Sequence, residues 1–338
     1  MKTAFKKTLL AAAMALPALP MSAAQAAPAF SQGLNFIQVQ NAESLFRTDA
    51  GCSANGGCLG AGTGPTGWQT VNPAIANNFQ SGDVFAGVLN VQNIQGNNGQ
   101  TYLASPTNQF TGYFAQEITS VLQPDPYPGG VSAPQAHVVL SVPTTDPFGR
   151  LGAGQMFQLY AQSGGGTTIY NESGTFASTI AAATDGTLWA TLGAGSTVTP
   201  GTPVSDGYAY SHVDLTQTIA NLDSISFAAL NIVTTGGAFN LGNIKPINAQ
   251  VENEVGGVGP APNTGQCDPS LMTCTDFVGE VKITPNVFWT GQNTGGNSPW
   301  VFTSNDPFKV YVPEPATVAL MGLGLFGMAG VRRRAKRS

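Results

Sequence analysis

Four cysteines are the most reactive side chains of this 338-residue chain, and they fall into two close pairs. Cys52 and Cys58 enclose five residues. Cys267 and Cys274 enclose six. If the chain is exported, an even number of cysteines in tight pairs predicts local disulfides, and of the three possible connectivities we favour 52–58 with 267–274. A four-cysteine zinc site is the alternative, but both spacings exceed the two to four residues usual for zinc, so we expect no metal.

The two histidines do not form a recognisable catalytic group. His137 opens an apolar segment, and His212 stands between Ser211 and Asp214. A nucleophilic triad needs converging side chains, whereas neighbours along a strand point to opposite faces. The sequence also contains no Gly-x-Ser-x-Gly, His-Glu-x-x-His or phosphate-binding loop motif. We therefore expect no catalytic residue and no cofactor, and a protein that is not an enzyme.

One pair of carboxylates has a spacing that chemistry can use. Glu252 and Glu254 would lie on the same side of an extended segment, about 7 Å apart. That separation suits a solvated strand edge, part of a calcium site or an acid–base pair acting on a sugar. No Asp-x-Asp-x-Asp-Gly loop accompanies the pair, so we interpret it as a solvated edge.

Aromatic side chains offer a second route to sugars, because their faces stack on pyranose rings. Trp289 and Trp300 flank a Gly- and Asn-rich turn, as the strands of a hairpin would. The alternative is that the tryptophans fill the protein core, and we favour that interpretation for each of Trp68, Trp189, Trp289 and Trp300.

Charge is concentrated at the two ends of the chain. Charged residues make up 9% of the sequence, against roughly 25% in an average soluble protein. Between residues 27 and 311, seventeen carboxylates face five cations, which leaves a net charge of −12; the cations are Arg47, Arg150, Lys245, Lys282 and Lys309. A surface of this sign repels phosphate backbones, which excludes nucleic-acid binding.

The N-terminus has the three parts of a secretory signal peptide. Lys2, Lys6 and Lys7 precede the apolar segment Thr8–Leu19, and Ala24-Gln25-Ala26 fits a signal peptidase. The pattern predicts a signal peptide over residues 1–26 rather than an amphipathic first helix.

The C-terminus has the composition of a short membrane anchor. Residues 316–331 are sixteen uncharged residues followed by a basic cluster. As a helix they would rise about 24 Å, slightly less than the hydrocarbon core, and the basic end would stay in the cytoplasm. We expect transient anchoring in the inner membrane rather than a buried C-terminal helix.

This end of the chain resembles the PEP-CTERM sorting tail. The motif is Val312-Pro313-Glu314-Pro315, followed by the Gly- and Leu-rich span and the terminal arginines, over residues 312–338. The resemblance implies that an exosortase recognises Pro313, Glu314 and Pro315 and removes the helix, with Arg332, Arg333 and Arg334 as the stop-transfer residues. It further implies release to the cell surface or extracellular matrix of a Gram-negative producer of exopolysaccharide. Members linked to flocculation are similar in layout, with a Gly- and Asn-rich β body of this size.

Residues 27–311 have the pattern of an all-β body, an antiparallel β-sandwich or a jelly roll. Short apolar or alternating segments bounded by Gly, Pro, Asn or Asp predict strands, and no apolar stripe of helical period is sustained. The expected strands are Val84–Ile94, Thr111–Val121, His137–Val142, Met156–Ala161, Thr167–Tyr170, Gly174–Ile180, Gly186–Leu192, Ser224–Val233, Phe277–Thr284 and Phe308–Val312.

Three segments are typical of loops: Gly51–Gly67, Gln123–Pro134 and Gly256–Pro269. The second is rich in proline, so the body has either a subdomain break near 123–134 or a surface loop there.

The sequence therefore predicts a non-enzymatic, exported protein of the cell surface or matrix that contributes to exopolysaccharide-associated biofilm or floc formation. Its expected partners are signal peptidase and exosortase during processing, then exopolysaccharide or further copies of itself. A carbohydrate-binding module is the first alternative, and a secreted polysaccharide hydrolase is the second.

Overall fold

Antiparallel strands make up most of the structure, so the all-β prediction is confirmed. The computed structural model describes residues 30–76, 78–96, 99–105, 108–123, 135–163, 170–195, 209–214, 224–235, 247–248, 274–285 and 297–312. The predicted signal peptide, the sorting tripeptide and the membrane segment 316–331 lie outside these ranges.

The elements follow one another along the chain as β1 (Gly33–Thr48), α2 (Asp49–Asn55), β2 (Trp68–Thr70), β3 (Val84–Gly96), β4 (Gly99–Leu103), β5 (Asn108–Leu122), β6 (Gln135–Ser141), β7 (Phe157–Ser163), α3 (Phe176–Ala183), β8 (Thr187–Ala194), β9 (Ala209–Asp214), β10 (Ser224–Thr235), β11 (Ile247–Asn248), β12 (Cys274–Thr275), β13 (Phe277–Pro285) and β14 (Phe302–Val312).

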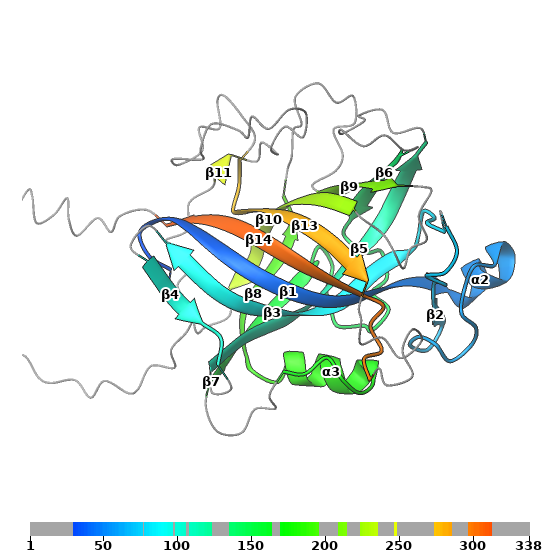
Figure 1. Ribbon diagram of the computed structural model, residues 1–338, viewed down its shortest axis with the longest axis horizontal. Coiled ribbons are helices and arrows are strands. Elements are labelled where there is room, and N and C mark those ends of the chain that lie inside the picture. Colours follow the sequence, from blue (N-terminus) through cyan, green and yellow to red (C-terminus); the bar gives the residue numbers. More distant parts are fainter. Residues whose placement is uncertain are drawn as a thin grey trace, which may run out of the picture.

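The main sheet closes on itself (Figure 1). Its path runs β3-β1-β14-β13-β10-β8-β7-β5, and β5 returns to pair with β3. β4 extends outward from β3, β2 pairs with the end of β1, and β6 with β9 forms a second connection between β5 and β10. The two walls of the closed sheet face each other across one core, as the layers of a sandwich do.

The proline-rich segment 123–134 connects two strands of this same sheet. β5 ends at Leu122 and β6 begins at Gln135, and the two strands pair with each other. Residues 124–134 lie outside the described ranges.

The interior of the closed sheet is a packed apolar core. Phe110 and Trp189 meet edge to face with ring centroids 4.8 Å apart, and Phe114 stacks on Phe157 at 5.4 Å. An apolar cavity lined by all eight strands of the closed path measures only about 30 Å³. That space is too small for an organic ligand, so the described side chains around it form a packed core.

A second apolar cluster lies on the outer face of β1, β3 and β5, where α3 covers the sheet. Ala42, Phe46, Val84 and Val88 are among its buried residues. Trp300, fully buried, packs here against Phe176 of α3 with ring centroids 4.8 Å apart. The half of this outer face that α3 covers is therefore as buried from solvent as the interior.

The helix α3 corrects the prediction of a strand over Gly174–Ile180. Its N-terminus is capped by Thr175, whose side chain accepts from the Ser178 backbone while Ser178 bonds back to Thr175. Its last carbonyls accept from side chains of the sheet, Ala183 from Thr111 and Ala182 from Gln162, both at 2.7 Å. Capping at both ends stabilises a two-turn helix that isolated propensity would leave marginal.

The loop expected over Gly51–Gly67 also begins in helical conformation. α2 starts after Thr48, whose hydroxyl accepts from the Gly51 backbone at 3.0 Å. Within the described ranges, neither α2 nor α3 is long and apolar enough to cross a membrane.

Candidate functional site

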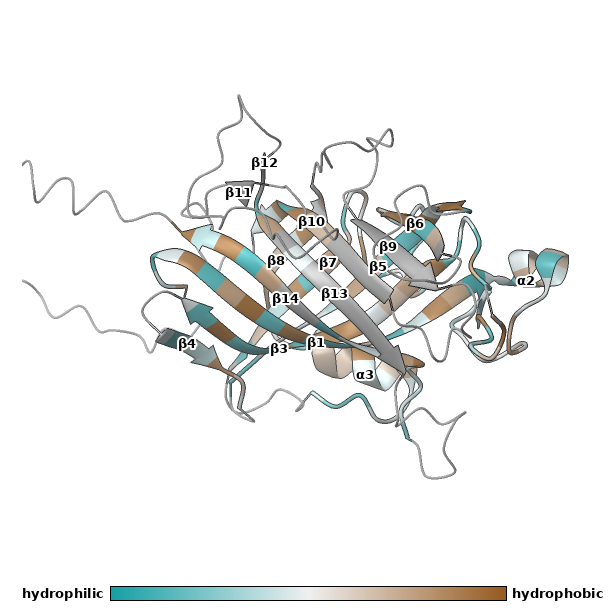
Figure 2. Cartoon of the chain, turned by 45° about the horizontal axis from the view of Figure 1, so that its top comes forward, coloured by the Kyte–Doolittle hydropathy of each residue, from teal (hydrophilic) through white to brown (hydrophobic). Residues whose placement is uncertain are grey.

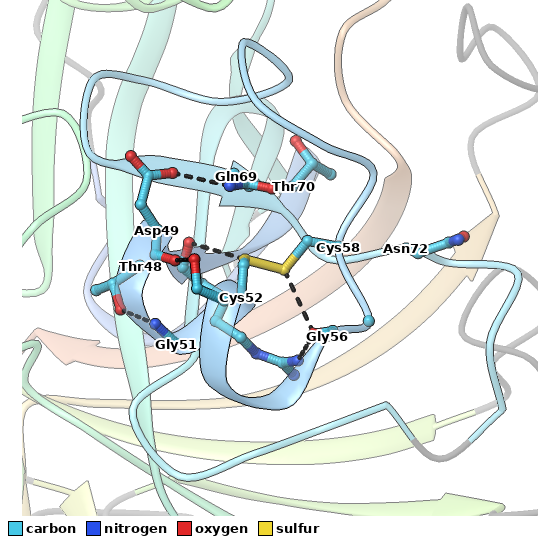
Figure 3. Close-up of a disulfide and its surroundings, with 12 residues drawn as sticks. Thr48, Asp49, Gly51, Cys52, Gly56, Cys58, Gln69, Thr70 and Asn72 are labelled. Atoms are coloured by element: carbon cyan, nitrogen blue, oxygen red, sulfur yellow. Dashed lines mark hydrogen bonds between the residues drawn. A yellow bond between two sulfur atoms is a disulfide. The ribbon is translucent and has the colours of Figure 1, made fainter.

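The disulfide Cys52–Cys58 ties the end of α2 to the following loop, with Cα atoms 5.8 Å apart (Figure 3). Gly56 donates its backbone N–H to the Cys52 carbonyl at 2.8 Å, which ends the helix. Cys58 then pairs with Val71 in an isolated bridge beside β2. The pairing 52–58 is thus present, whereas Cys267 lies outside the described residues and its pairing with Cys274 stays a prediction.

A buried ion pair anchors this end of the molecule. The Arg47 guanidinium donates to both carboxylate oxygens of Asp83, at 2.7 and 2.8 Å, and both side chains are almost fully buried. Arg47 also donates to the carbonyls of Gly56 and Asn78 at 2.8 and 3.1 Å. Burial raises the pKa of the Asp83 carboxyl and Arg47 lowers it, so the guanidinium compensates part of the desolvation. Every polar contact of this group is internal, which makes it structural.

The histidines come together in a way the sequence did not reveal. His137 of β6 lies opposite His212 of β9 in the strand register, and Ser211 and Asp214 lie on the same strand as His212. The His137 side chain is buried. Among the described residues, no group of three or more His, Cys, Asp or Glu side chains is close enough to hold a metal ion.

The described tryptophans are buried, as we favoured. Trp189 and Trp300 are fully buried, and Trp68 is 8% exposed. None of these three can present its ring to a glycan. Trp289 and the pair Glu252 and Glu254 lie outside the described ranges.

A polar groove occupies the half of the outer face that α3 leaves uncovered. Along β1, Phe36, Gln38 and Gln40 are exposed while Ile37 and Val39 are buried, and beyond Asn41 the strand is buried on both sides. Figure 2 shows the corresponding alternation of hydrophilic and hydrophobic bands along β1 and β3. The exposed half of this face therefore begins where the cover of α3 ends.

Side-chain amides from three adjacent strands line this amide groove, which has a volume of about 580 Å³. Leu103 of β4 and the next residue, Ala104, form one margin of the groove. The lining amide and hydroxyl residues are Gln38 and Gln40 of β1, Gln92 and Asn93 of β3, and Thr303, Ser304 and Asn305 of β14.

Hydrogen bonds between neighbouring strands hold the amides in place. Asn93 donates to the Gln38 carbonyl oxygen at 2.6 Å, and Gln92 donates to that of Gln40 at 3.4 Å. The register shifts between Gln38 and Val39, because β3 has one extra residue, Gln92, at this point. At such a bulge two residues of one strand stand opposite one residue of its partner, so Gln92 and Asn93 both lie beside β1 here.

One segment of the sequence indicates part of this site. Phe36-Ile37-Gln38-Val39-Gln40 alternates cleanly between the two faces, which predicts a strand with amides on its exposed side. In the fold these residues lie beside Gln92, Asn93 and Asn305 because of the register between strands that are distant in the sequence. The pattern of a single strand does not contain that register.

The fold and this surface define an all-β protein with a neutral, amide-rich groove among its described residues. Residues 312–334 match the model of the PEP-CTERM protein-sorting motif, which begins at the last residue of β14. The chain thus carries a PEP-CTERM sorting motif at its C-terminal end, which implies processing by an exosortase and sorting to the cell envelope or surface of a Gram-negative bacterium. No curated protein and no solved structure matches the chain significantly, so the role of the body has to be argued from its own geometry.

Proposed function

We propose that this protein is a non-enzymatic component of the extracellular matrix that associates with exopolysaccharide and contributes to biofilm or floc formation. The observation that carries the proposal is the sorting motif at residues 312–334, because such a motif implies export and sorting to the cell envelope or surface.

The surface chemistry of the body supports the same role. Its groove is lined by amides and hydroxyl groups, which exchange hydrogen bonds with water and with sugar hydroxyls at little desolvation cost. A carbohydrate-binding module, our second candidate, is favoured by the same groove.

Deletion of the gene tests the proposal. Loss of a matrix component should reduce cell aggregation and the amount of polysaccharide retained with the cells, while leaving polymer chain length unchanged. A tagged body should be found in the extracellular fraction. Unchanged aggregation, or shorter polymer chains only when the protein is present, would contradict a structural role, and the second result would point to a hydrolase.

A further inference from the structure

We propose that the amide groove binds an uncharged polysaccharide chain, laid across β4, β3, β1 and β14 with Phe36 as a stacking surface. This inference rests on the proposed function and adds to it a binding site, a class of polymer and the residues that hold it.

The amides are arranged to bond with sugar hydroxyls. Each side-chain amide has two N–H donors and a carbonyl acceptor, and a hydroxyl group both donates and accepts. Asn93 donates one N–H to Gln38, and Gln92 donates one N–H to Gln40. Each of these two donors therefore retains a second N–H and its own carbonyl oxygen for a ligand. Side chains already held in place lose less rotational freedom when a ligand binds.

One exposed apolar side chain, Leu103, lines the groove, and a second, Phe36, precedes the lining residue Gln38 by two positions on β1. Leu103 of β4, opposite Asn93 in the register, is 63% exposed, and Phe36 is 44% exposed. Phe36 lies on the same face of β1 as Gln38, about 7 Å along the strand. The C–H faces of pyranose rings are apolar, so a sugar chain covers these side chains while its hydroxyls meet the amides.

The charge distribution of the protein favours an uncharged polymer as the ligand of the groove. The groove lining has no ionisable side chain, and residues 27–311 have a net charge of −12. A polyuronate or a phosphate-bearing polymer would lose hydration at the groove without gaining ion pairs there, and it would be repelled at long range.

The size and position of the groove fit a segment of a chain. Its volume of about 580 Å³ lies in the range of small-ligand sites, roughly 300–1,000 Å³. The register places Leu103, Asn93, Gln38 and Pro307 side by side on four strands, a row about 14 Å long at ~4.8 Å per strand.

Calorimetric titration of the exported protein tests the inference. The probes are hexasaccharides of an uncharged β-1,4-glucan and of a polyuronate, together with the extracellular polysaccharide of the producing culture. Calorimetry needs no tryptophan at the site, and the described tryptophans Trp68, Trp189 and Trp300 are buried and do not line the groove. We expect binding of an uncharged probe or the native polymer, at least tenfold weaker in Gln38→Ala and in Phe36→Ala.

The matched control is Asn55→Ala, which removes an exposed amide from α2 at the opposite end of the molecule from β4 (Figure 1). It should bind as the unaltered protein does, and all three variants should keep its melting temperature.

Three results would overturn the inference: no binding of any probe, preferential binding of the polyuronate, or equal affinity in Gln38→Ala. Sedimentation that shows a dimer abolished by Gln38→Ala would instead assign the groove to a second copy of the chain. None of these results affects extracellular delivery or the aggregation defect of the deletion strain, so the proposed function is tested separately.

Discussion

Glu43 is a carboxyl group enclosed in the apolar interior of the closed sheet. It shares the inward side of β1 with Ile37 and Val39, and Gly87 opposite leaves room for it, since a Cβ at Gly87 would approach the Glu43 Cβ to 2.8 Å. Burial raises the pKa of Glu43 and a hydrogen bond with Ser304 lowers it by less, so that the pKa moves from 4.5 to about 7. Its Oε1 atom has no hydrogen-bond partner.

The first prediction is a loss of stability with rising pH that depends on Glu43. The unfolded chain releases this proton near pH 4.5, whereas the folded protein holds it until about pH 7. The contribution of Glu43 to the unfolding free energy therefore falls as pH rises through this window, by about 1.4 kcal/mol per pH unit. Glu43→Gln, which cannot ionise, should flatten the profile measured by urea unfolding.

The control for this experiment is Asp185→Asn, which alters an exposed carboxylate and should leave the profile unchanged. If Glu43→Gln has the same slope between pH 4.5 and 7 as the unaltered protein, then Glu43 is ionised in the fold and the proposed desolvation is wrong.

At the scale of elements, α2 depends on the disulfide between Cys52 and Cys58. The disulfide joins Cys52, inside this helix of seven residues, to Cys58, three residues beyond its end. A helix this short is not stable alone. Cys52→Ser with Cys58→Ser should lower the unfolding free energy by about 2 kcal/mol, because a small ring constrains the unfolded chain only moderately. Chemical denaturation with and without reductant measures this: reductant should destabilise the parent protein more than the double variant, which keeps only the predicted Cys267–Cys274 bond. Equal loss in both would mean that the Cys52–Cys58 bond contributes no stability.

The docking of α3 rests on Trp300. Its indole N–H donates to the Thr179 hydroxyl of α3 at 3.1 Å, and its ring is fully buried. Trp300→Ala should cost about 3–5 kcal/mol through the cavity it leaves. Trp300→Phe keeps most of the volume and should cost about 1 kcal/mol for the lost hydrogen bond.

Urea unfolding distinguishes these two contributions, with Leu59→Ala, at a side chain 40% exposed, as the control that should change little. A loss in Trp300→Phe as large as in Trp300→Ala would mean that the hydrogen bond, and not the packing, holds the helix.

Strands with a mainly apolar or cleanly alternating sequence were predictable, such as Val84–Ile94 within β3, whereas a strand that mixes buried polar with apolar residues was not. Phe277–Thr284 alternates cleanly and corresponds to β13. In β1 the buried polar residues Glu43, Ser44 and Arg47 mix with apolar ones, because α3 and the ion pair bury both sides there. Because of this mixture, the sequence pattern does not predict β1, a strand of sixteen residues, over its full length. α3 was mistaken for a strand because two turns are too short for a helical period to be evident.

At the scale of the whole molecule, the candidate site follows from closure of the sheet. Gln40 faces Asn305 only because β1 pairs with β14, the first and last strands of the closed path along the chain. The types of these residues, neutral amides on strands of low charge, were visible in the composition. Their convergence required a register between segments some 265 residues apart, for which no local pattern exists.

The same closure makes β14 essential to the fold. It lies between β1 and β13 and contributes Phe302, Phe308 and Val310 to the core. Its last residue, Val312, pairs with Gly33 at the start of β1 and is also the first residue of the sorting motif. The body thus ends where the motif begins, and the two should be separable by a cut at this residue.

The last prediction compares two truncations. A chain that ends at Val312 keeps β14 whole and should melt cooperatively at the temperature of the full-length protein. A chain that ends at Val301 leaves the facing edges of β1 and β13 without β14 and opens the core to water, so it should show no cooperative transition. Circular dichroism during heating provides the measurement. Both variants lack the tail, so the difference between them reports β14 alone; cooperative melting of the shorter chain would mean that the fold does not require the sheet to close.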